Sequence, residues 1–464
     1  MSMRSAVLNW PLNSVKNGKM TPPNILFIFT DQQNRYALGC MDNPNVETPH
    51  LDQLAQRGVL FRRCYSNDPV CGPFRGSLLT GQYTSRCGVR DNGDPLPDGT
   101  TTFADAFNAA GYQTSWVGKW HLGGNGNCPI PVGLRGGFQR FKGYQCYNGF
   151  YKDVCFYDEQ DREHRYDYHR TDVTTDIAIA ELELLAGRDK PFMLMMSYQA
   201  PHYPEQPAPA YEALYKGRKI IRRPNCQDIN PFTPTVSPRS PQPVENDPDF
   251  QRYGNHLDEY IRLYNAMCTQ IDANVGRLLA TLDRLGVADH TIVVFTSDHG
   301  DMQGSHGLKN KCLPHEESAG IPLIVSAPGL PGGRVTDGLV SGIDLMPTCL
   351  ELAGLDPVES VDGISIAPFL RGETDKTCPA VFSERGDWCM IVKDGWKLAA
   401  ERQDDGLAPT LMTHLDEDPY ELINRVEDLG CADCRRALLD ELSGWDRDVR
   451  VLTPSSRTVI TSIA

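Results

Sequence analysis

Apolar residues along the first 370 positions follow two alternating patterns. In short runs they are nearly continuous and stop at a polar residue, which is typical of strands buried on both faces of a sheet. Between the runs they recur every three to four positions, which is typical of helices with one buried face. The runs predict strands at residues 24–30, 113–117, 192–197, 292–296 and 323–326. The helical spacing predicts helices at residues 50–56, 103–110, 172–185 and 260–282.

This alternation of strands and helices predicts the fold class. Strands that are separated by helices usually pair side by side in a mostly parallel sheet, and the helices cover both of its faces. We therefore expect an α/β protein with one large central sheet.

Two stretches interrupt the alternation. Residues 201–248 hold 11 of the 34 prolines, and this density predicts a long irregular excursion with a functional role at the rim of a site. Residues 144–170 are rich in Tyr, Phe, His and charged side chains. That composition suits either a surface on which sugars stack or the packing of a loop.

The pattern changes from about residue 375. Two apolar segments, Trp388–Lys393 and Trp396–Ala400, flank the turn sequence Asp394-Gly395, which predicts a β-hairpin. A helix is expected near Arg435–Leu442. We predict three regions: an N-terminal extension at residues 1–20, a main domain at 21–372, and a small α+β C-terminal subdomain at 373–464.

The composition is that of an ordinary folded protein, with 40% hydrophobic and 23% charged residues. Lys and Arg number 45 against 60 Asp and Glu, so the formal net charge is −15. An acidic chain is a poor binder of nucleic acid. No apolar run approaches the roughly 18 to 20 residues that span a bilayer. We therefore expect neither a nucleic-acid nor a membrane partner.

Cysteine usage and the first residues bear on location. The 15 cysteines are an odd number without a framework spacing, which suits a reducing compartment. The first 23 residues contain no hydrophobic core of a signal peptide and no small-residue cleavage site. The sequence predicts a cytoplasmic protein, with the periplasm as the alternative if the native N-terminus is missing.

Polar side chains follow four of the predicted strands. The carboxyl ends of parallel strands meet at one edge of a sheet, where ligands bind in open α/β folds. Two acids, two lysines and three histidines delivered to one edge predict a functional site there. The residues are Asp31, Gln32, Lys119, His121, His202, Asp298, His299 and Lys311.

The segment from Cys71 to Arg75 adds a possible nucleophile. Pro73 is favoured in the first turn of a helix, which places Cys71 at the helix N-terminus. Backbone N–H groups and the helix dipole attract anions there and lower a thiol pKa. Cys71 is therefore either a thiolate nucleophile or a modified group facing an anionic substrate. Only three residues separate Cys71 from Arg75, whereas a cysteine-dependent phosphatase loop needs five.

The string Cys71-x-Pro73-x-Arg75, followed by Leu79-Thr80-Gly81, resembles the signature of type I sulfatases, which belong to the alkaline phosphatase superfamily. The resemblance covers nearly the whole chain and implies an alkaline-phosphatase-like α/β fold. Its other motifs are Asn24–Asp31, Gly118–His121, Pro201-His202, Thr296–Gly300, Gly307–Lys311, Glu316–Ser318 and Leu415–Glu421.

The resemblance implies a modified nucleophile and a metal ion. In this family the cysteine is oxidised to Cα-formylglycine (3-oxoalanine), which requires a formylglycine-generating maturation enzyme. The implied metal is Ca²⁺, held by Asp31, Gln32, Asp298, His299 and the modified Cys71. Gln32 stands where many relatives have a second Asp, and His299 where some have Asn. These departures lower the ligand charge and leave Mg²⁺ or Mn²⁺ as alternatives.

The resemblance also implies a role for each remaining residue. Arg75 and the metal activate one hydroxyl of the aldehyde hydrate, which attacks sulfur. Lys119 and Lys311 hold the sulfate oxygens. His202, together with Lys311, protonates the leaving oxygen. His121 then takes the proton of the second hydroxyl, and sulfate is expelled.

The implied activity is hydrolysis of sulfate monoesters, with a small sulfated saccharide as the first choice of substrate. Aryl and alkyl sulfates, including choline sulfate, are alternatives. A phosphonate monoester hydrolase or phosphodiesterase of the same superfamily is a further alternative, although the Lys119-Trp120-His121 element favours sulfate. An inactive glycan-binding homologue is the alternative of a different class, but the chain retains Cys71, Arg75 and the other implied groups. The oligomeric state is left open.

Overall fold

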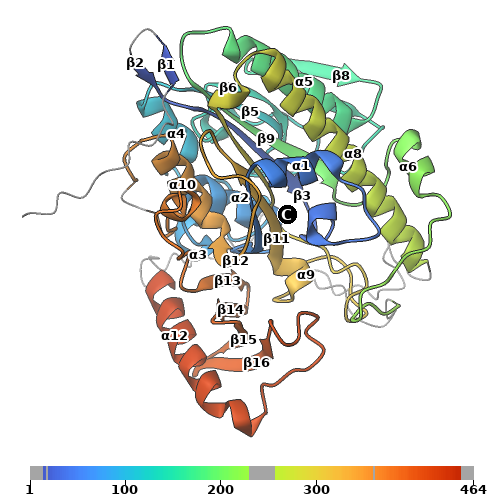
Figure 1. Ribbon diagram of the computed structural model, residues 1–464, viewed down its shortest axis with the longest axis vertical. Helices are drawn as coiled ribbons and strands as arrows, with labels where there is room; N and C mark the ends of the chain where they lie inside the picture. The colour runs from blue at the N-terminus through green and yellow to red at the C-terminus, as the bar shows by residue number, and fades with distance from the viewer. Residues whose placement is uncertain (1–13, 17–18, 229–255, 359–360, 451–464) are drawn as a thin grey trace, which may run out of the picture.

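The computed structural model describes residues 14–16, 19–228, 256–358 and 361–450 (Figure 1). Its main feature is a ten-stranded sheet with the order β12-β4-β11-β10-β3-β9-β5-β6-β7-β8. The strands are β3 (Asn24–Asp31), β4 (Val59–Tyr65), β5 (Gln113–Lys119), β6 (Arg140–Tyr144), β7 (Val154–Tyr157), β8 (Glu163–Tyr166), β9 (Phe192–Pro201), β10 (Thr291–Ser297), β11 (Gly320–Ser326) and β12 (Arg334–Ser341).

The middle of this sheet is parallel. Strands β10, β3, β9, β5 and β6 run in one direction. Strands β11, β7 and β8 introduce antiparallel pairs, and β12 pairs parallel with β4 near the other edge. The predicted α/β class with a mostly parallel central sheet is therefore confirmed.

Helices cover both faces of the sheet (Figure 1). The buried residues of β3 alternate between them: Phe27 and Phe29 pack with α2, α4 and α10, whereas Leu26 and Ile28 pack with α1, α5 and α8. This two-sided burial explains why the strand sequence is continuously apolar. The helices are α1 (Pro49–Arg57), α2 (Cys71–Thr80), α3 (Thr84–Cys87), α4 (Phe103–Ala109), α5 (Arg170–Ala186), α6 (Pro209–Tyr215), α8 (Leu257–Arg284), α9 (Glu316–Ala319), α10 (Leu345–Leu352) and α11 (Ala367–Leu370). Short 3-10 turns are η1 (Gly39–Met41), η2 (Val132–Leu134), η4 (Ala288–His290) and η5 (Gly342–Asp344).

The C-terminal region forms a separate four-stranded antiparallel sheet, at the bottom of Figure 1. The predicted hairpin is present as β14 and β15, and its turn residues Asp394 and Gly395 have φ values of 50° and 79°, as a tight hairpin turn requires. Leu438 and Leu442 of the last helix pack against the sheet. The elements are β13 (Val381–Arg385), β14 (Trp388–Lys393), β15 (Trp396–Gln403), β16 (Gly406–His414), η6 (Leu429–Cys431) and α12 (Ala432–Arg450). The residue ranges of the three regions stay a prediction.

The structure differs from the sequence-based expectation in the proline-rich stretch. It contains helix α6, which begins with Pro209 in the first helical turn, where the missing N–H of proline costs nothing. Residues 229–248 of that stretch lie outside the described residues. In the predicted N-terminal extension, β1 (Ser14–Lys16) pairs with β2 (Lys19–Thr21), and the other positions before residue 19 are likewise not described.

The aromatic stretch at residues 144–170 lies mainly at the β6-β7-β8 edge of the sheet. Its rings surround Arg170, whose guanidinium lies 4.3 Å from the ring centre of Tyr144 and 5.6 Å from that of Tyr147. Tyr168 is partly exposed and its hydroxyl donates to Asp176 at 2.7 Å. These contacts favour loop packing over a sugar-stacking surface. In the part of the chain that the structure describes, no helix is both long and apolar enough to cross a membrane.

Candidate active site

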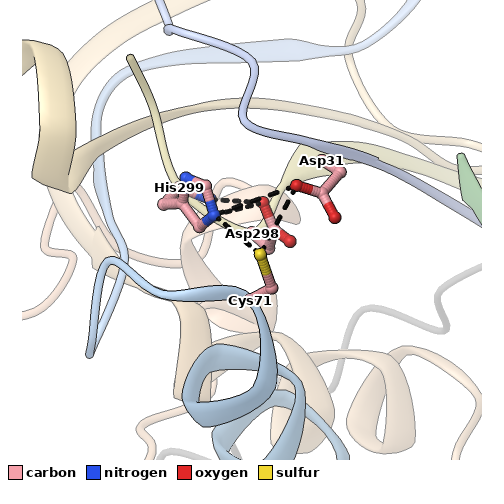
Figure 2. Close-up of side chains that lie close together, drawn as sticks. All are labelled: Asp31, Cys71, Asp298 and His299. Carbon is pink, nitrogen blue, oxygen red and sulfur yellow. Dashed lines mark hydrogen bonds and ion pairs between the residues drawn. The ribbon is translucent and has the colours of Figure 1, made fainter. Parts of the chain in front are cut away.

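The predicted site residues come together at the carboxyl edge of the parallel strands. Asp31 ends β3 and Lys119 ends β5, while His202 and Asp298 directly follow β9 and β10. Cys71 is the first residue of α2, whose N-terminus points at the same edge (Figure 2). Sheet topology therefore assembles side chains that are more than 200 positions apart in the sequence.

Four buried side chains face one another at the centre of the site (Figure 2). The Sγ atom of Cys71 lies 3.6 Å from Oδ1 of Asp31 and 3.3 Å from Nε2 of His299. The same nitrogen lies 3.4 Å from Oδ1 of Asp298 and 3.9 Å from Oδ1 of Asp31. All four potential ligand atoms lie within 4.8 Å of one another. We name these four residues the catalytic cluster.

The other oxygen of each carboxylate faces a cation. Oδ2 of Asp31 and Oδ2 of Asp298 both accept hydrogen bonds from Arg75 at 3.2 Å, and Lys119 also binds Oδ2 of Asp31. Arg75 is fixed by two further acceptors, the hydroxyl of Ser197 at 2.7 Å and the carbonyl of Lys119 at 2.8 Å. The cations thus hold the carboxylates in place and leave their Oδ1 atoms turned toward the centre.

The electrostatics of the cluster favour a bound cation. Burial raises the pKa of Asp298, and the neighbouring Asp31 raises it further. Burial opposes ionisation of Asp31 as well, but Lys119, His202 and Lys311 outweigh it and lower its pKa to about 2. Burial likewise raises the pKa of the Cys71 thiol, and Lys119, Lys311 and His299 more than reverse this effect. Carboxylate oxygens with one imidazole nitrogen suit a hard or borderline divalent metal.

Gln32 lies beside this cluster, in a backbone conformation with φ 67° that L-residues rarely adopt. Its N–H donates to Oδ1 of Asp298 at 2.9 Å, and its side-chain oxygen accepts from Lys311 at 2.8 Å. Its side-chain nitrogen donates to Asp301 and to Asn310. The amide oxygen of Gln32 is bound by Lys311 in this structure. The role of Gln32 as a metal ligand therefore stays a prediction.

Lys311 and the two other histidines surround Cys71. Nζ of Lys311 lies 3.3 Å from Sγ of Cys71. His202 also contacts Cys71, and burial together with Lys311 lowers the pKa of its imidazole to about 4. Burial and Lys119 lower the pKa of His121, but Cys146 and Cys71 outweigh them and raise it to about 9.

Four residues that contact the predicted set were not identified as site residues from the sequence. Ser197 binds Arg75, and Asn125 accepts from His121 at 2.8 Å. Cys146 is half-buried beside Lys119 and His121, which lower its thiol pKa against the opposing effect of burial. Asp301 binds Gln32 and accepts from the Tyr260 hydroxyl at 2.8 Å. Of these four residues, only Ser197 had a recognisable sequence feature, because it is the last residue of the predicted strand at residues 192–197.

A second group of buried charges lies between α9 and the C-terminal sheet. Lys397 of β15 binds Oε1 of Glu316 at 2.6 Å and Oε1 of Glu421 at 2.9 Å. Arg35 binds the other oxygen of Glu316, and Oε2 of Glu421 accepts from the N–H of Glu316 at 2.7 Å. We name Arg35, Glu316, Lys397 and Glu421 the interdomain cluster. The adjoining Glu317 is paired with Arg223 at 3.2 Å.

Comparison with known proteins places this geometry in a family. The sulfatase family profile matches residues 23–355, and the profile of the N-sulphoglucosamine sulphohydrolase C-terminal region matches residues 304–447. An ulvan-active sulfatase of Formosa agariphila is 33% identical over 76% of this chain. The match spans 65% of that relative's length, slightly less than two thirds.

Solved structures agree with the sequence comparison. One, described as a complex with its substrate D-glucosamine-2-N,6-O-disulfate, has a TM-score of 0.79 and 26% identity, covering 94% of this chain and all of the other. The phosphonate monoester hydrolase of Silicibacter pomeroyi has a TM-score of 0.74 and 26% identity, covering 95% of this chain and 98% of the other. With a matching profile over most of its length and the expected residues gathered at one edge of the sheet, the chain belongs to the sulfatase family.

Proposed function

We propose that this protein hydrolyses sulfate monoesters of carbohydrates, with residue 71 in its formylglycine form. The observation that carries the proposal is the surroundings of Cys71. Its side chain stands at a helix N-terminus, next to Lys311 and at the centre of the catalytic cluster. The thiol sulfur marks the position that the hydrate oxygens of formylglycine would occupy. An anionic ester sulfate fits this setting because Arg75, Lys119 and Lys311 supply positive charge around it.

The residues present fit a divalent cation, for which Ca²⁺ is the first choice and Mg²⁺ or Mn²⁺ are alternatives. Asp31, Asp298, His299 and residue 71 would hold it, since their ligand atoms already face one another. A bound cation supplies Lewis acidity, which lowers the pKa of a hydroxyl group near it. The two Oδ1 atoms are buried and like-charged, so removal of the cation leaves them mutually repulsive.

Lys119 and Lys311 would bind and orient the sulfate group. Both side chains are buried, with exposed fractions of 0% and 8%. Burial alone lowers a lysine pKa, but nearby acidic groups outweigh it and raise the pKa of both. Both ammonium groups are thus charged at neutral pH and can stabilise negative charge that develops on the sulfate oxygens.

Two histidines would move protons. The imidazole of His202 is neutral at pH 7 in the free protein, since its pKa is lowered to about 4. A bound anion raises that pKa, so the ring becomes a proton donor to the leaving alcohol only in the substrate complex, with charged Lys311 beside it. His121, which also contacts residue 71, would accept the proton whose removal restores the aldehyde.

Carbohydrate sulfates are the first choice of substrate because of the relatives. The names of the ulvan-active sulfatase and of the glucosamine disulfate complex both refer to sulfated sugars. Aryl and choline-type sulfates remain alternative substrates. The second candidate activity is phosphonate monoester hydrolysis, favoured by the similarity to the Silicibacter pomeroyi enzyme. The Lys119-Trp120-His121 element places an ammonium and an imidazole beside residue 71, which favours sulfate.

The test is a substrate panel on protein coexpressed with a formylglycine-generating enzyme. The panel holds sulfated mono- and disaccharides, 4-nitrophenyl sulfate, choline sulfate and a phenyl phosphonate monoester, with Cys71→Ala as the matched control. We expect kcat/KM to be highest for a sulfated saccharide and to fall to background in Cys71→Ala. A higher kcat/KM for the phosphonate ester would replace the proposal by the second candidate. Binding of sulfated sugars without turnover by matured protein would indicate a glycan-binding homologue.

A further inference from the structure

We infer that Trp388 of the C-terminal sheet positions Lys311 in the active site by holding the loop on which Lys311 stands. The inference rests on the proposed function, in which Lys311 binds the sulfate group. It gives the C-terminal sheet a part in sulfate binding, although the catalytic cluster lies entirely outside that sheet.

The loop that bears Lys311 leads from the end of β10 to α9, and its backbone is strained around the lysine. Asn310 and Cys312, the two neighbours of Lys311 in the chain, have φ values of 69° and 76°. Both values lie in the left-handed region, which costs free energy in residues with a side chain and persists only where the surroundings enforce it. The direction in which the Lys311 side chain leaves the loop therefore depends on contacts that its neighbours make.

The Lys311 side chain needs this support because its ammonium group must reach residue 71 at a defined place. Its Nζ lies 3.3 Å from Sγ of Cys71 and 2.8 Å from the amide oxygen of Gln32. A lysine ammonium stands on a flexible four-carbon stem, so these contacts alone do not define its position. The place of Nζ relative to residue 71 therefore also depends on where the loop holds the Cα atom of the lysine.

The C-terminal sheet binds the loop directly after Lys311. The indole Nε1–H of Trp388, the first residue of β14, donates to the carbonyl oxygen of Cys312 at 3.0 Å. Lys397 of β15 adds a second hydrogen bond two residues further along, to the carbonyl oxygen of Pro314 at 2.8 Å. An indole N–H only donates hydrogen bonds and a carbonyl oxygen only accepts them, so the direction of the Trp388 contact is unambiguous.

The main domain holds the same loop at two other points. The N–H of Met302 donates to the carbonyl oxygen of Asn310 at 2.8 Å, and the N–H of Leu313 donates to the hydroxyl of Ser318 at 3.0 Å. Trp388 binds the carbonyl of the residue between these two points, the one that directly follows the lysine. Its hydrogen bond therefore restrains the strained peptide on which the direction of the lysine side chain depends.

Trp388 can act as an anchor because its own position is fixed. Its backbone pairs with Arg385 of β13 on one side and with Glu401 of β15 on the other. Its ring is partly buried and packs against the larger hydrophobic core of the main domain. A side chain that is held by packing and by a sheet on both sides can hold a neighbouring loop within a few tenths of an ångström.

The kinetic test is a double-mutant cycle on the matured protein, with kcat/KM measured for the best sulfate ester of the substrate panel. Trp388→Phe keeps an aromatic ring but removes the N–H donor, and it should lower kcat/KM about 10-fold, because small displacements of an active-site group are costly. In a Lys311→Ala background the same substitution should change kcat/KM by less than about 2-fold, since its effect passes through Lys311. The matched control is Trp396→Phe in the same hairpin, whose ring instead packs against His414, and it should keep wild-type kcat/KM.

Amide hydrogen exchange tests the contact without activity and so separates this inference from the proposed function. In the peptide that contains Lys311, exchange should be at least about 10-fold faster in Trp388→Phe than in the wild type and unchanged in Trp396→Phe. Unchanged exchange in Trp388→Phe, equally faster exchange over the whole C-terminal sheet, wild-type kcat/KM in Trp388→Phe, or a further 10-fold loss in the Lys311→Ala background would each overturn the inference. No turnover of any sulfate ester by matured wild-type protein would overturn the proposed function and, with it, the part of Trp388 in sulfate binding. Hydrogen exchange would then still decide whether Trp388 holds the loop.

Discussion

The catalytic cluster and the interdomain cluster are both buried groups of acids and bases, yet their carboxylates are used differently. In the catalytic cluster, cations occupy only the Oδ2 atoms of Asp31 and Asp298. Both Oδ1 atoms face the same point, together with Cys71 and His299. In the interdomain cluster, Lys397 bridges two carboxylates, and the remaining oxygens accept from Arg35 and a backbone N–H.

The catalytic cluster therefore keeps a carboxylate oxygen of each acid directed at a possible ligand, whereas every carboxylate oxygen of the interdomain cluster is already bound by a side-chain cation or a backbone N–H. His306, Glu317 and Glu421 also bring three possible metal-ligand atoms within 4.8 Å of one another. Their two carboxylates, however, already pair with Arg223 and Lys397, so a divalent ion would add uncompensated charge. The interdomain cluster instead connects α9, next to the active site, with strand β15 of the C-terminal sheet. Proximity of acids alone does not distinguish the catalytic cluster from the interdomain cluster, whereas the carboxylate oxygens that side-chain cations bind do.

The largest effect that would test this comparison is expected from Asp298→Ala. Loss of one inward-facing carboxylate should abolish metal retention, measured by elemental analysis, and lower kcat/KM by at least about 10³-fold. The control is Glu421→Gln in the interdomain cluster, which should leave metal content unchanged. Full sulfatase activity in exhaustively chelated wild-type protein would show that the catalytic cluster needs no metal.

The sequence predicted the site around the catalytic cluster because the sheet brings strand ends together and Pro73 places Cys71 at a helix N-terminus. Asp31, Lys119, His202 and Asp298 stand at the ends of apolar strands, so their meeting follows once the strands are parallel. The side chains of the interdomain cluster have no such pattern. Glu316 and Glu421 were part of quoted motifs without a role, and Lys397 lies within a hairpin strand, where nothing in the sequence marks it as buried.

The short edge strands and Asn125 show a second limit of sequence reasoning. Strand β8 is four residues of which three are exposed, so it lacks the apolar periodicity on which the strand predictions relied. Asn125 belongs to a glycine-rich loop whose path depends on the backbone bridge between Gly126 and Cys146. Such a contact is set by tertiary structure and leaves no local signal.

A second prediction concerns the interdomain cluster. Lys397→Met leaves two buried carboxylates without their shared cation and should lower the free energy of unfolding by about 3–5 kcal/mol. The matched control is Lys393→Met, because Lys393 pairs with Glu441 at the partly exposed end of the neighbouring strand and contributes about 0–1 kcal/mol. Chemical denaturation measures both. Equal losses in the two variants would contradict the structural role assigned to Lys397.

The smallest predicted effect concerns pH. Burial lowers the pKa of His315, and His306 and Lys397 lower it further, to about 3. The unfolded chain binds a proton at this residue below about pH 6.5, whereas the folded protein does not until far lower pH. This residue therefore costs stability as pH falls from 6.5 toward 3.

His315→Gln removes that titration. At pH 5 the variant should recover about 2 kcal/mol of unfolding free energy relative to wild type, with pH 7.5 as the reference condition. Chemical denaturation at the two pH values measures the difference. A stability-versus-pH profile parallel to that of the wild type would show that His315 is not held neutral by its surroundings.

The central claim is that residue 71 acts as formylglycine, and the most direct measurement is the mass of the peptide that contains it. Preparations with and without a coexpressed maturation enzyme should differ in the fraction of that peptide in which the thiol is replaced by an aldehyde. We predict that sulfatase activity per mole of protein rises in proportion to this fraction and extrapolates to zero at no conversion. Full activity in protein whose Cys71 thiol is intact would contradict the account.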